Sequence, residues 1–128
     1  MKGFKINLEN ATKGNNNYRR VLYTAKHSQL VLMSLLPGEE IGEEVHDLDQ
    51  FFRFEAGEGK VILDGVEQAV QQDDAVIIPE GTRHNVINTG QQALKLYTLY
   101  SPPEHKDSTV HRTKAEAKEE HFDGVTSE

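Results

Sequence analysis

The sequence contains no cysteine, so disulfides, thiolate nucleophiles and thiolate-held zinc are all excluded. Long apolar runs are also missing. Residues 30–33 and 75–78 are the longest, far below the roughly 20 apolar residues that span a bilayer. Residues 1–7 lack the apolar segment of a secretory signal. These absences predict a cytoplasmic protein with no membrane partner.

Positive charge is scarce in this chain. Lysine and arginine number 14 against 21 aspartates and glutamates, which gives a formal net charge of -7. Such a chain repels phosphate backbones and anionic membrane surfaces unless its positive charge is gathered in one place. The one tight basic pair, Arg19-Arg20, falls in a strand-like segment. Nucleic acid is therefore not an expected partner.

No long helical period appears before residue 110, whereas short β-prone segments alternate with turn signals about every ten residues. An Asp64-Gly65 pair separates two of these segments and is a strong hairpin signal, because both turn positions need positive φ. The spacing predicts an all-β sandwich or barrel. The expected strands are residues 18–23, 29–36, 43–46, 50–55, 60–63, 66–70, 74–78, 83–87 and 93–100.

The two ends of the chain differ from its middle. Residues 7–17 are polar and rich in asparagine, which predicts a loop. Residues 113–120 contain good helix formers, with Thr113 or Ser108 as a possible cap, and residues 123–128 are expected to fray. At 128 residues the chain suits one domain. We expect an N-terminal arm (1–17), a barrel (18–101) and a C-terminal loop, short helix and flexible tail (102–128).

Four side chains with metal-ligand chemistry lie near the ends of expected strands. Glu44 and His46 are two residues apart on one strand and so share a face. Gln50 follows a three-residue turn, and His84 follows a Pro-x-Gly turn at the start of a later strand. One carboxylate, two imidazoles and one amide oxygen suit manganese, iron, zinc or nickel, and such an ion acts as a Lewis acid. The alternative is a solvated polar edge.

The spacing around Glu44 resembles the first motif of the cupin superfamily. That motif runs Gly, five residues, His-x-His, three or four residues, Glu, six residues, Gly. In this chain the matching positions are Gly38, Glu44, His46, Gln50 and Gly57. Glutamate replaces the first histidine, and glutamine replaces the glutamate.

The spacing around His84 resembles the second cupin motif, which runs Gly, five residues, Pro-x-Gly, two residues, His, three residues, Asn. Here the matching positions are Asp73, Pro79, Gly81, His84 and Asn88. Aspartate replaces the first glycine, and aspartate tolerates the left-handed backbone region better than most residues. Across both motifs the carboxylate changes place but the ligand set keeps a single negative charge. The cupin-type sugar-phosphate isomerases use the same kinds of ligand in another order.

The resemblance implies a cupin double-stranded β-helix, that is, a jelly-roll barrel, and a homodimer. Among cupins the chain is similar to small bacterial proteins described as mannose-6-phosphate isomerase-like. The resemblance implies an isomerase, lyase or dioxygenase acting on a sugar, sugar phosphate or keto compound. A non-catalytic small-molecule-binding module is the alternative, since the fold alone does not select a reaction.

Aromatic residues and one histidine are candidates to line a substrate pocket: Phe52, Phe54, Tyr97, Tyr100 and His105. Alternation places the two phenylalanines on the face of Gln50, where plain core packing is the competing role. The two tyrosines fall on opposite faces of one strand. A stiff Ser-Pro-Pro segment precedes Glu104 and His105, either of which is a candidate proton shuttle. Arg53 faces the pocket only if a bulge shifts its strand. The sequence does not identify the proton-transfer residue.

Overall fold

The computed structural model describes residues 2–128, which form nine β-strands. Eight of the nine expected strands are present, each within two residues of its expected ends. The strands are β1 (Arg19–Thr24), β2 (Gln29–Leu35), β3 (Asp49–Ala56), β4 (Glu58–Leu63), β5 (Val66–Gln71), β6 (Ala75–Ile78), β7 (His84–Asn88), β8 (Leu94–Ser101) and β9 (Val110–His111).

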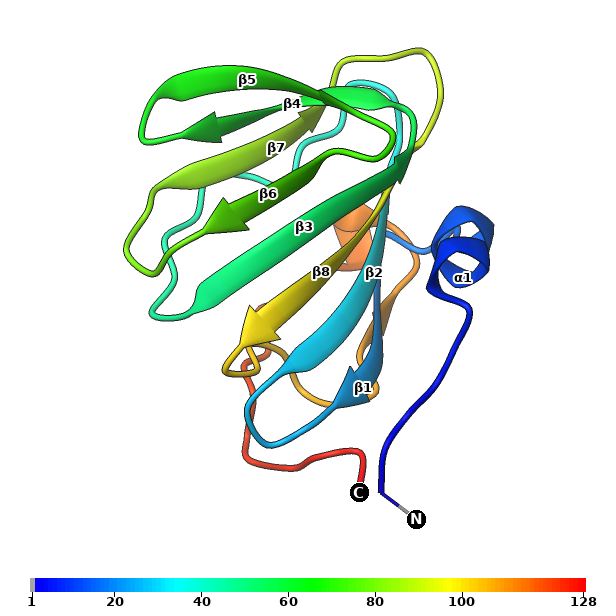
Figure 1. Cartoon of the computed structure of the whole chain (residues 1–128), viewed down its shortest axis with the longest axis vertical. Helices are drawn as coiled ribbons and strands as arrows, with labels where there is room; N and C mark the ends of the chain where they lie inside the picture. Colours follow the sequence, from blue (N-terminus) through cyan, green and yellow to red (C-terminus); the bar gives the residue numbers. More distant parts are fainter. Residues whose placement is uncertain (1) are drawn as a thin grey trace.

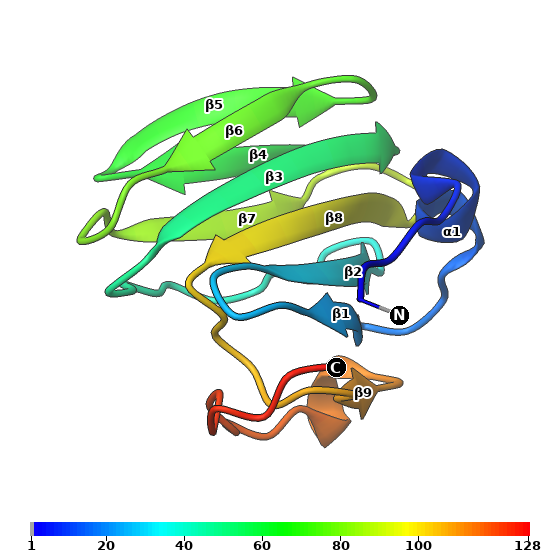
Figure 2. The same cartoon turned by 60° about the horizontal axis from the view of Figure 1, so that its bottom comes forward.

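The strands build two antiparallel sheets that face each other across a hydrophobic core (Figure 1, Figure 2). The larger sheet has the order β6-β3-β8-β2-β1-β9, and the smaller has the order β5-β4-β7. Five of the seven neighbouring pairs in these orders are non-consecutive in the chain, as in a jelly roll. The predicted all-β jelly-roll class is confirmed. None of the helices in residues 2–128 has the length and apolar character needed to span a bilayer.

Strand alternation decides which side chains enter the core. On β8, Leu94, Leu96, Thr98 and Tyr100 are all buried, as expected for residues two apart on one face. On β3, Gln50, Phe52 and Phe54 are buried, while Phe51 and Arg53 are partly exposed on the other face. The register shifts by a bulge only beyond Phe54, so Arg53 stays outside, bonded to Asp73 at 3.0 Å.

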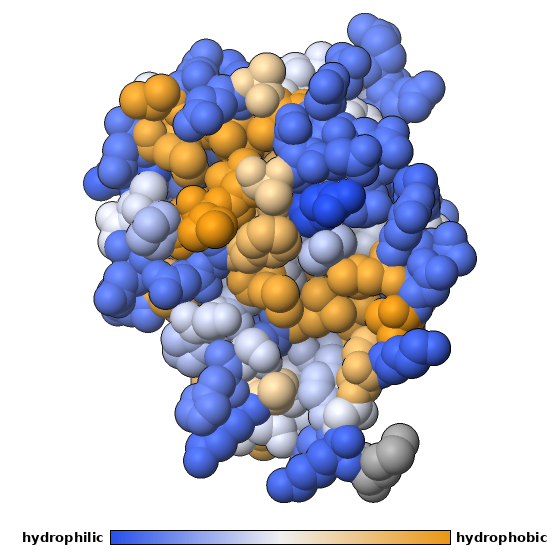
Figure 3. All heavy atoms as spheres, viewed as in Figure 1, coloured by the Kyte–Doolittle hydropathy of each residue, from blue (hydrophilic) through white to orange (hydrophobic). Residues whose placement is uncertain are grey.

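The outer face of the larger sheet carries an apolar row. Ile77 pairs with Phe51, Phe51 pairs with Leu99, and Leu99 pairs with Leu30, so the four lie across four strands. Ile77 is 68% exposed. An apolar band crosses the face seen in Figure 3. The homodimer remains a prediction.

The turn residues adopt the backbone conformations that the sequence predicts. Asp64 and Gly65 have φ values of 47° and 83°, as the predicted hairpin between β4 and β5 requires. Asp73 has a φ of 74°, so the aspartate that replaces the motif glycine adopts the left-handed conformation.

Three local predictions were wrong. Residues 7–17 contain helix α1 (Leu8–Gly14), because the Asn7 side chain caps it by accepting a hydrogen bond from Asn10 N at 3.0 Å and because Thr12 is buried. The expected helix over 113–120 is a single 3₁₀ turn, η1 (Lys114–Glu116), capped by Thr113. Residues 43–46 are not a regular strand, since the positive φ values of Gly38 and Gly42 interrupt the extended run before them.

The C-terminal residues are held in place rather than frayed. Ser127 N donates to Thr24 O at 2.9 Å, and Ser127 Oγ donates to Asp107 Oδ1 at 2.8 Å. Glu128 accepts hydrogen bonds from Tyr23 and from Gly3 N. Thr24, Tyr23 and Gly3 lie more than a hundred residues away in the chain, so local sequence carried no signal for these contacts.

Candidate functional site

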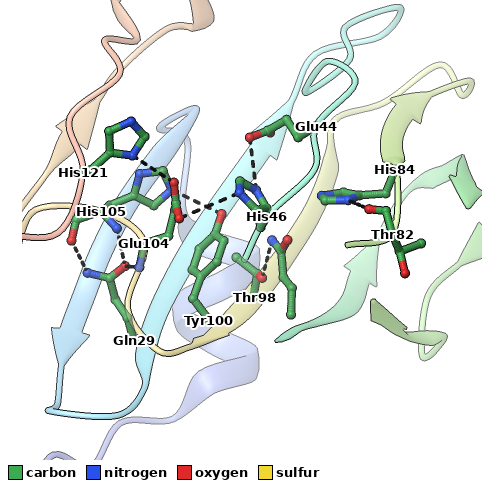
Figure 4. Close-up of polar contacts among 11 residues, drawn as sticks. Gln29, Glu44, His46, Thr82, His84, Thr98, Tyr100, Glu104, His105 and His121 are labelled. Carbon is green, nitrogen blue, oxygen red and sulfur yellow. Dashed lines mark hydrogen bonds and ion pairs between the residues drawn. The ribbon is translucent and has the colours of Figure 1, made fainter. Parts of the chain in front are cut away.

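Glu44 and His84 lie directly opposite each other in an isolated antiparallel bridge. Each backbone N–H donates to the other residue's carbonyl at 2.9 Å. Opposed residues of an antiparallel pair project to the same side. His46 O accepts a further hydrogen bond from Gly81 N at 2.9 Å, which extends the attachment. The backbone therefore brings Glu44, His46 and His84 to one end of the jelly roll (Figure 4).

Glu44 and His46 form a polar pair, with Glu44 Oε2 3.1 Å from His46 Nε2. The hydrogen bond to Glu44 raises the pKa of His46. Burial opposes ionisation of the Glu44 carboxyl, but the hydrogen bond and charge of His46 outweigh it, and the Glu44 pKa is lowered. An ion binding to both groups must displace the proton that they share.

Gln50 and His84 each present an atom that can act as a ligand. Gln50 Nε2 donates to Thr98 Oγ1 at 3.0 Å, while the buried Gln50 Oε1 has no hydrogen-bond partner among residues 2–128. His84 Nδ1 lies 2.9 Å from Thr82 O, and a carbonyl accepts only. The proton is therefore on Nδ1, and Nε2 keeps its lone pair for another partner.

The separation of the two imidazole rings bears on whether both can bind one divalent ion. Two imidazoles that bind the same tetrahedral ion at about 2 Å have ring centroids about 5 Å apart. The His46 and His84 centroids are 5.3 Å apart. Within residues 2–128 no three His, Cys, Asp or Glu side chains already form a metal-holding cluster, and the fourth candidate donor is an amide. The lone pair of His84 and the orphaned oxygen of Gln50 fit an ion.

The five pocket candidates occupy different places. Tyr100 is buried, with its ring 6.1 Å from that of His46, and its hydroxyl lies 3.2 Å from His105 Nε2. Phe52 and Phe54 pack against each other in the core at 6.2 Å. Tyr97 lies on the outer face beside Phe51, at 6.3 Å between centroids. The structure thus brings Tyr100 and His105 to His46 and leaves the other three away from it.

Glu104 lies between two histidines at this end of the fold. Its Oε1 is 3.1 Å from His121 Nδ1, and its Oε2 is 3.8 Å from His46 Nδ1 (Figure 4). The buried Gln29 amide fixes the segment, because its Oε1 accepts from Glu104 N and His105 N and its Nε2 donates to His105 O at 2.7 Å. Glu104 is therefore held at a defined position near the candidate ligands.

A cavity of about 560 Å³ opens beside Glu44, His46 and Glu104. Its walls come from residues 41–46, from Glu104 and His105, and from the C-terminal segment 114–121. A larger hollow of about 700 Å³ is lined by residues around Gly57, Asp73 and Gly90 and includes none of the candidate site residues. The smaller cavity is the candidate substrate site.

Arg19 also lines this cavity, and it was not among the sequence-predicted site residues. It is 8% exposed and faces the core side of β1, in register with the buried Met33. Alternation along 18–23 was the available signal, because Arg19 is two residues from the apolar Val21, whereas Arg20 falls on the exposed face.

His105 provides a test by pH. Burial lowers the pKa of His105 to about 3, and its neutral Nε2 accepts from Tyr100. Because the folded pKa is below the unfolded value of about 6.5, this stabilisation is complete above pH 6.5 and is lost as pH falls toward 3. We expect His105→Gln to reduce the loss of unfolding free energy between pH 7 and pH 5 by about 2 kcal/mol. Denaturant titrations of both proteins at the two pH values measure it, and equal losses contradict it.

Comparison with protein-family models matches residues 31–100 to the family described as "Cupin domain". The chain is 49% identical to protein YrkC of Bacillus subtilis (strain 168) over 123 residues, which cover 91% of this chain and 66% of that protein. It is 42% identical to protein L612 of Acanthamoeba polyphaga mimivirus over 113 residues, covering 84% of this chain and 70% of that protein. The chain therefore spans about two thirds of the length of these relatives.

Solved structures show the same similarity. The crystal structure of BH2720 from Bacillus halodurans superposes with a TM-score of 0.88 at 47% identity, over 90% of this chain and 92% of that one. A predicted oxalate decarboxylase from Thermotoga maritima superposes with a TM-score of 0.58 at 23% identity, over 60% of this chain and 68% of that one. At that identity the second similarity concerns the fold alone.

Proposed function

The chain belongs to the cupin family, and from that premise we propose that it binds one divalent metal ion through Glu44, His46, Gln50 and His84. The proposed ion is manganese, iron, zinc or nickel, which accept this mixture of carboxylate, imidazole and amide donors. We propose further that the protein is an enzyme for a small polar molecule, such as a sugar, a sugar phosphate or a keto compound.

The observation that carries the proposal is the unpaired oxygen of Gln50. Gln50 is 4% exposed, and leaving a buried acceptor without a partner costs about 1–3 kcal/mol. Its amide nitrogen is satisfied by Thr98, which directs the oxygen rather than the nitrogen toward any further partner. His84 is oriented in the same way, with Nδ1 bonded to a carbonyl and Nε2 left free. Both residues are prepared to coordinate.

In the proposed reaction the protein's own groups bind the substrate and move a proton. A bound divalent ion would supply Lewis acidity toward a carbonyl or hydroxyl oxygen. Glu104 is the best-placed proton acceptor, since its carboxylate lines the cavity and lies 3.8 Å from His46. His121 contacts its other oxygen and is 70% exposed, so it connects Glu104 to solvent. The cavity volume of about 560 Å³ suits a small metabolite.

The test begins with metal content. We expect protein dialysed against manganese, iron, nickel or zinc to retain about one ion per chain by elemental analysis. Less than about a tenth of an ion for every metal would defeat the proposal. The loaded protein is then incubated with sugars, sugar phosphates and keto acids, with and without oxygen. Turnover supports an enzyme. A raised melting temperature without turnover supports the non-catalytic module instead.

The replacement Gln50→Glu restores the residue type of the cupin motif and separates two effects. In the metal-free protein a buried carboxylate at position 50 is unfavourable, so we expect a lower melting temperature. A second negative charge favours the divalent ion, so we expect at least tenfold tighter metal binding. Calorimetric titration and thermal melts with and without metal measure both. A variant with Gln50→Leu is the control, for which metal binding weakens. Unchanged affinity in Gln50→Glu would show that position 50 does not reach the ion.

A further inference from the structure

Arg19 is a buried cation at the start of β1. Its side chain lies on the inner face of the sheet with Val21, and the residue is 8% exposed. Among the described residues the guanidinium makes one hydrogen bond, in which Nη1 donates to His111 Nδ1 at 3.2 Å. Its Nε is buried with no partner in residues 2–128. The guanidinium has five N–H donors, so most of its capacity is unused.

No carboxylate forms an ion pair with Arg19 in the part of the chain that the structure describes. Four of the five glutamates that line the cavity have other partners. Glu43 pairs with Arg83 at 2.9 Å, and Glu104 pairs with His121 at 3.1 Å. A buried unpaired charge is strongly unfavourable, so a protein that keeps one normally supplies a partner for it.

The position of Arg19 indicates what that partner is. Arg19 lines the cavity of about 560 Å³ together with Glu44 and His46, and its charge is close enough to act on both. His111 is an acceptor at Nδ1 and fixes one side of the guanidinium. The guanidinium lies over the ring of Tyr18, with the ring centroid 5.2 Å from Arg19 Cζ. The planar fork is therefore oriented at the wall of the substrate cavity.

We propose that Arg19 binds the anionic group of the substrate, a carboxylate or a phosphate ester, whose oxygens accept two parallel N–H bonds from the guanidinium. This inference rests on the proposed function, because it assigns a charged substrate to the same cavity. It narrows the substrate class to sugar phosphates and keto acids and removes neutral sugars. Arginine suits this task because its rigid fork matches both anions.

The first experiment uses the metal-free wild-type protein, so that anions do not simply bind the metal. Inorganic phosphate and acetate are titrated separately while the Arg19 Nε–H resonance is followed by two-dimensional ¹H–¹⁵N NMR and assigned with Arg19→Lys. We expect a saturable shift with one or both anions. A response to phosphate alone indicates a phosphate ester, and a response to acetate alone indicates a carboxylate. No response to either overturns the proposal.

The second experiment compares Arg19→Gln with Arg20→Gln, the exposed neighbour on the same strand. Anions raise melting temperatures nonspecifically, and the Arg20 variant retains that effect. We expect at least tenfold weaker anion binding in Arg19→Gln and wild-type binding in Arg20→Gln. Equal weakening in both variants overturns the assignment. Should Arg19→Gln not fold, the wild-type NMR titration decides. Metal content is measured in parallel: anion binding without metal binding defeats only the proposed metal site, and metal binding without anion binding defeats only the role of Arg19.

Discussion

Replacing His84 with alanine is expected to remove the bound metal while leaving the fold intact. His84 is one of the two imidazoles of the proposed ligand set, and its Nδ1–H bond to Thr82 O at 2.9 Å leaves Nε2 as the proposed ligand atom. Loss of a group that merely orients a ligand weakens metal affinity by about 10- to 100-fold. Loss of the ligand itself is expected to cost at least about 100-fold. Metal content measured after dialysis should fall from about one ion per chain to below a tenth.

The matched control for this variant is His27→Ala. His27 is exposed between β1 and β2 and belongs to none of the contacts at the candidate site. Its variant should keep the metal content of the wild type. Circular dichroism and the melting temperature of the metal-free proteins establish that both variants fold. Retention of a full ion by folded His84→Ala would remove this residue from the ligand set.

The second large effect is expected on stability, from Gly57→Ala. Gly57 is the last glycine of the first cupin motif and has a φ of 88°. A Cβ built there would lie 2.5 Å from Ala93 O and 3.0 Å from Leu94 Cα, both backbone atoms of a neighbouring segment. The left-handed conformation costs alanine about 1–2 kcal/mol, and the overlap adds about 1–3 kcal/mol. We expect the free energy of unfolding to fall by about 2–5 kcal/mol.

Gly65→Ala separates the two causes. Gly65 has a φ of 83°, close to that of Gly57, but nothing lies within 4 Å of its added Cβ. This variant should lose only the conformational cost, about 1–2 kcal/mol. Urea unfolding of the three proteins gives both numbers. Equal losses in the two variants would show that the close approach of Gly57 to residues 93 and 94 does not matter.

Local sequence patterns were sufficient for most of the fold. Strand β8 alternates buried and more exposed residues over its eight positions, β3 does so over its first six, and turns such as Asp64-Gly65 have a conformation that few residue types accept. These signals act between neighbours in the chain. Helix α1 was missed because an asparagine-rich composition outweighed the cap at Asn7. Strand β9 was missed because it is two residues long and depends on pairing with β1.

In the candidate site, too, some residues were predicted from local patterns and others were missed. Motif spacing identified Glu44, His46, Gln50 and His84, although residues 43–46 form an isolated bridge rather than the expected strand. Arg19 was considered only as part of a basic pair in a strand-like segment, and its pairing with Met33 and His111 reveals that it faces inward. The position of Glu104 depends on Gln29, 75 residues earlier. Contacts between residues so far apart leave no periodic signal in a single sequence.

The central claim is that an ion lies between Glu44, His46, Gln50 and His84. Crystals of the metal-loaded protein, with diffraction recorded on both sides of the absorption edge of the loaded metal, test it most directly. The account predicts one anomalous peak per chain, within about 2.0–2.3 Å of Gln50 Oε1, His84 Nε2 and donor atoms of Glu44 and His46. An anomalous peak elsewhere, or none in fully loaded crystals, with the Gln50 oxygen still unpaired, would contradict it.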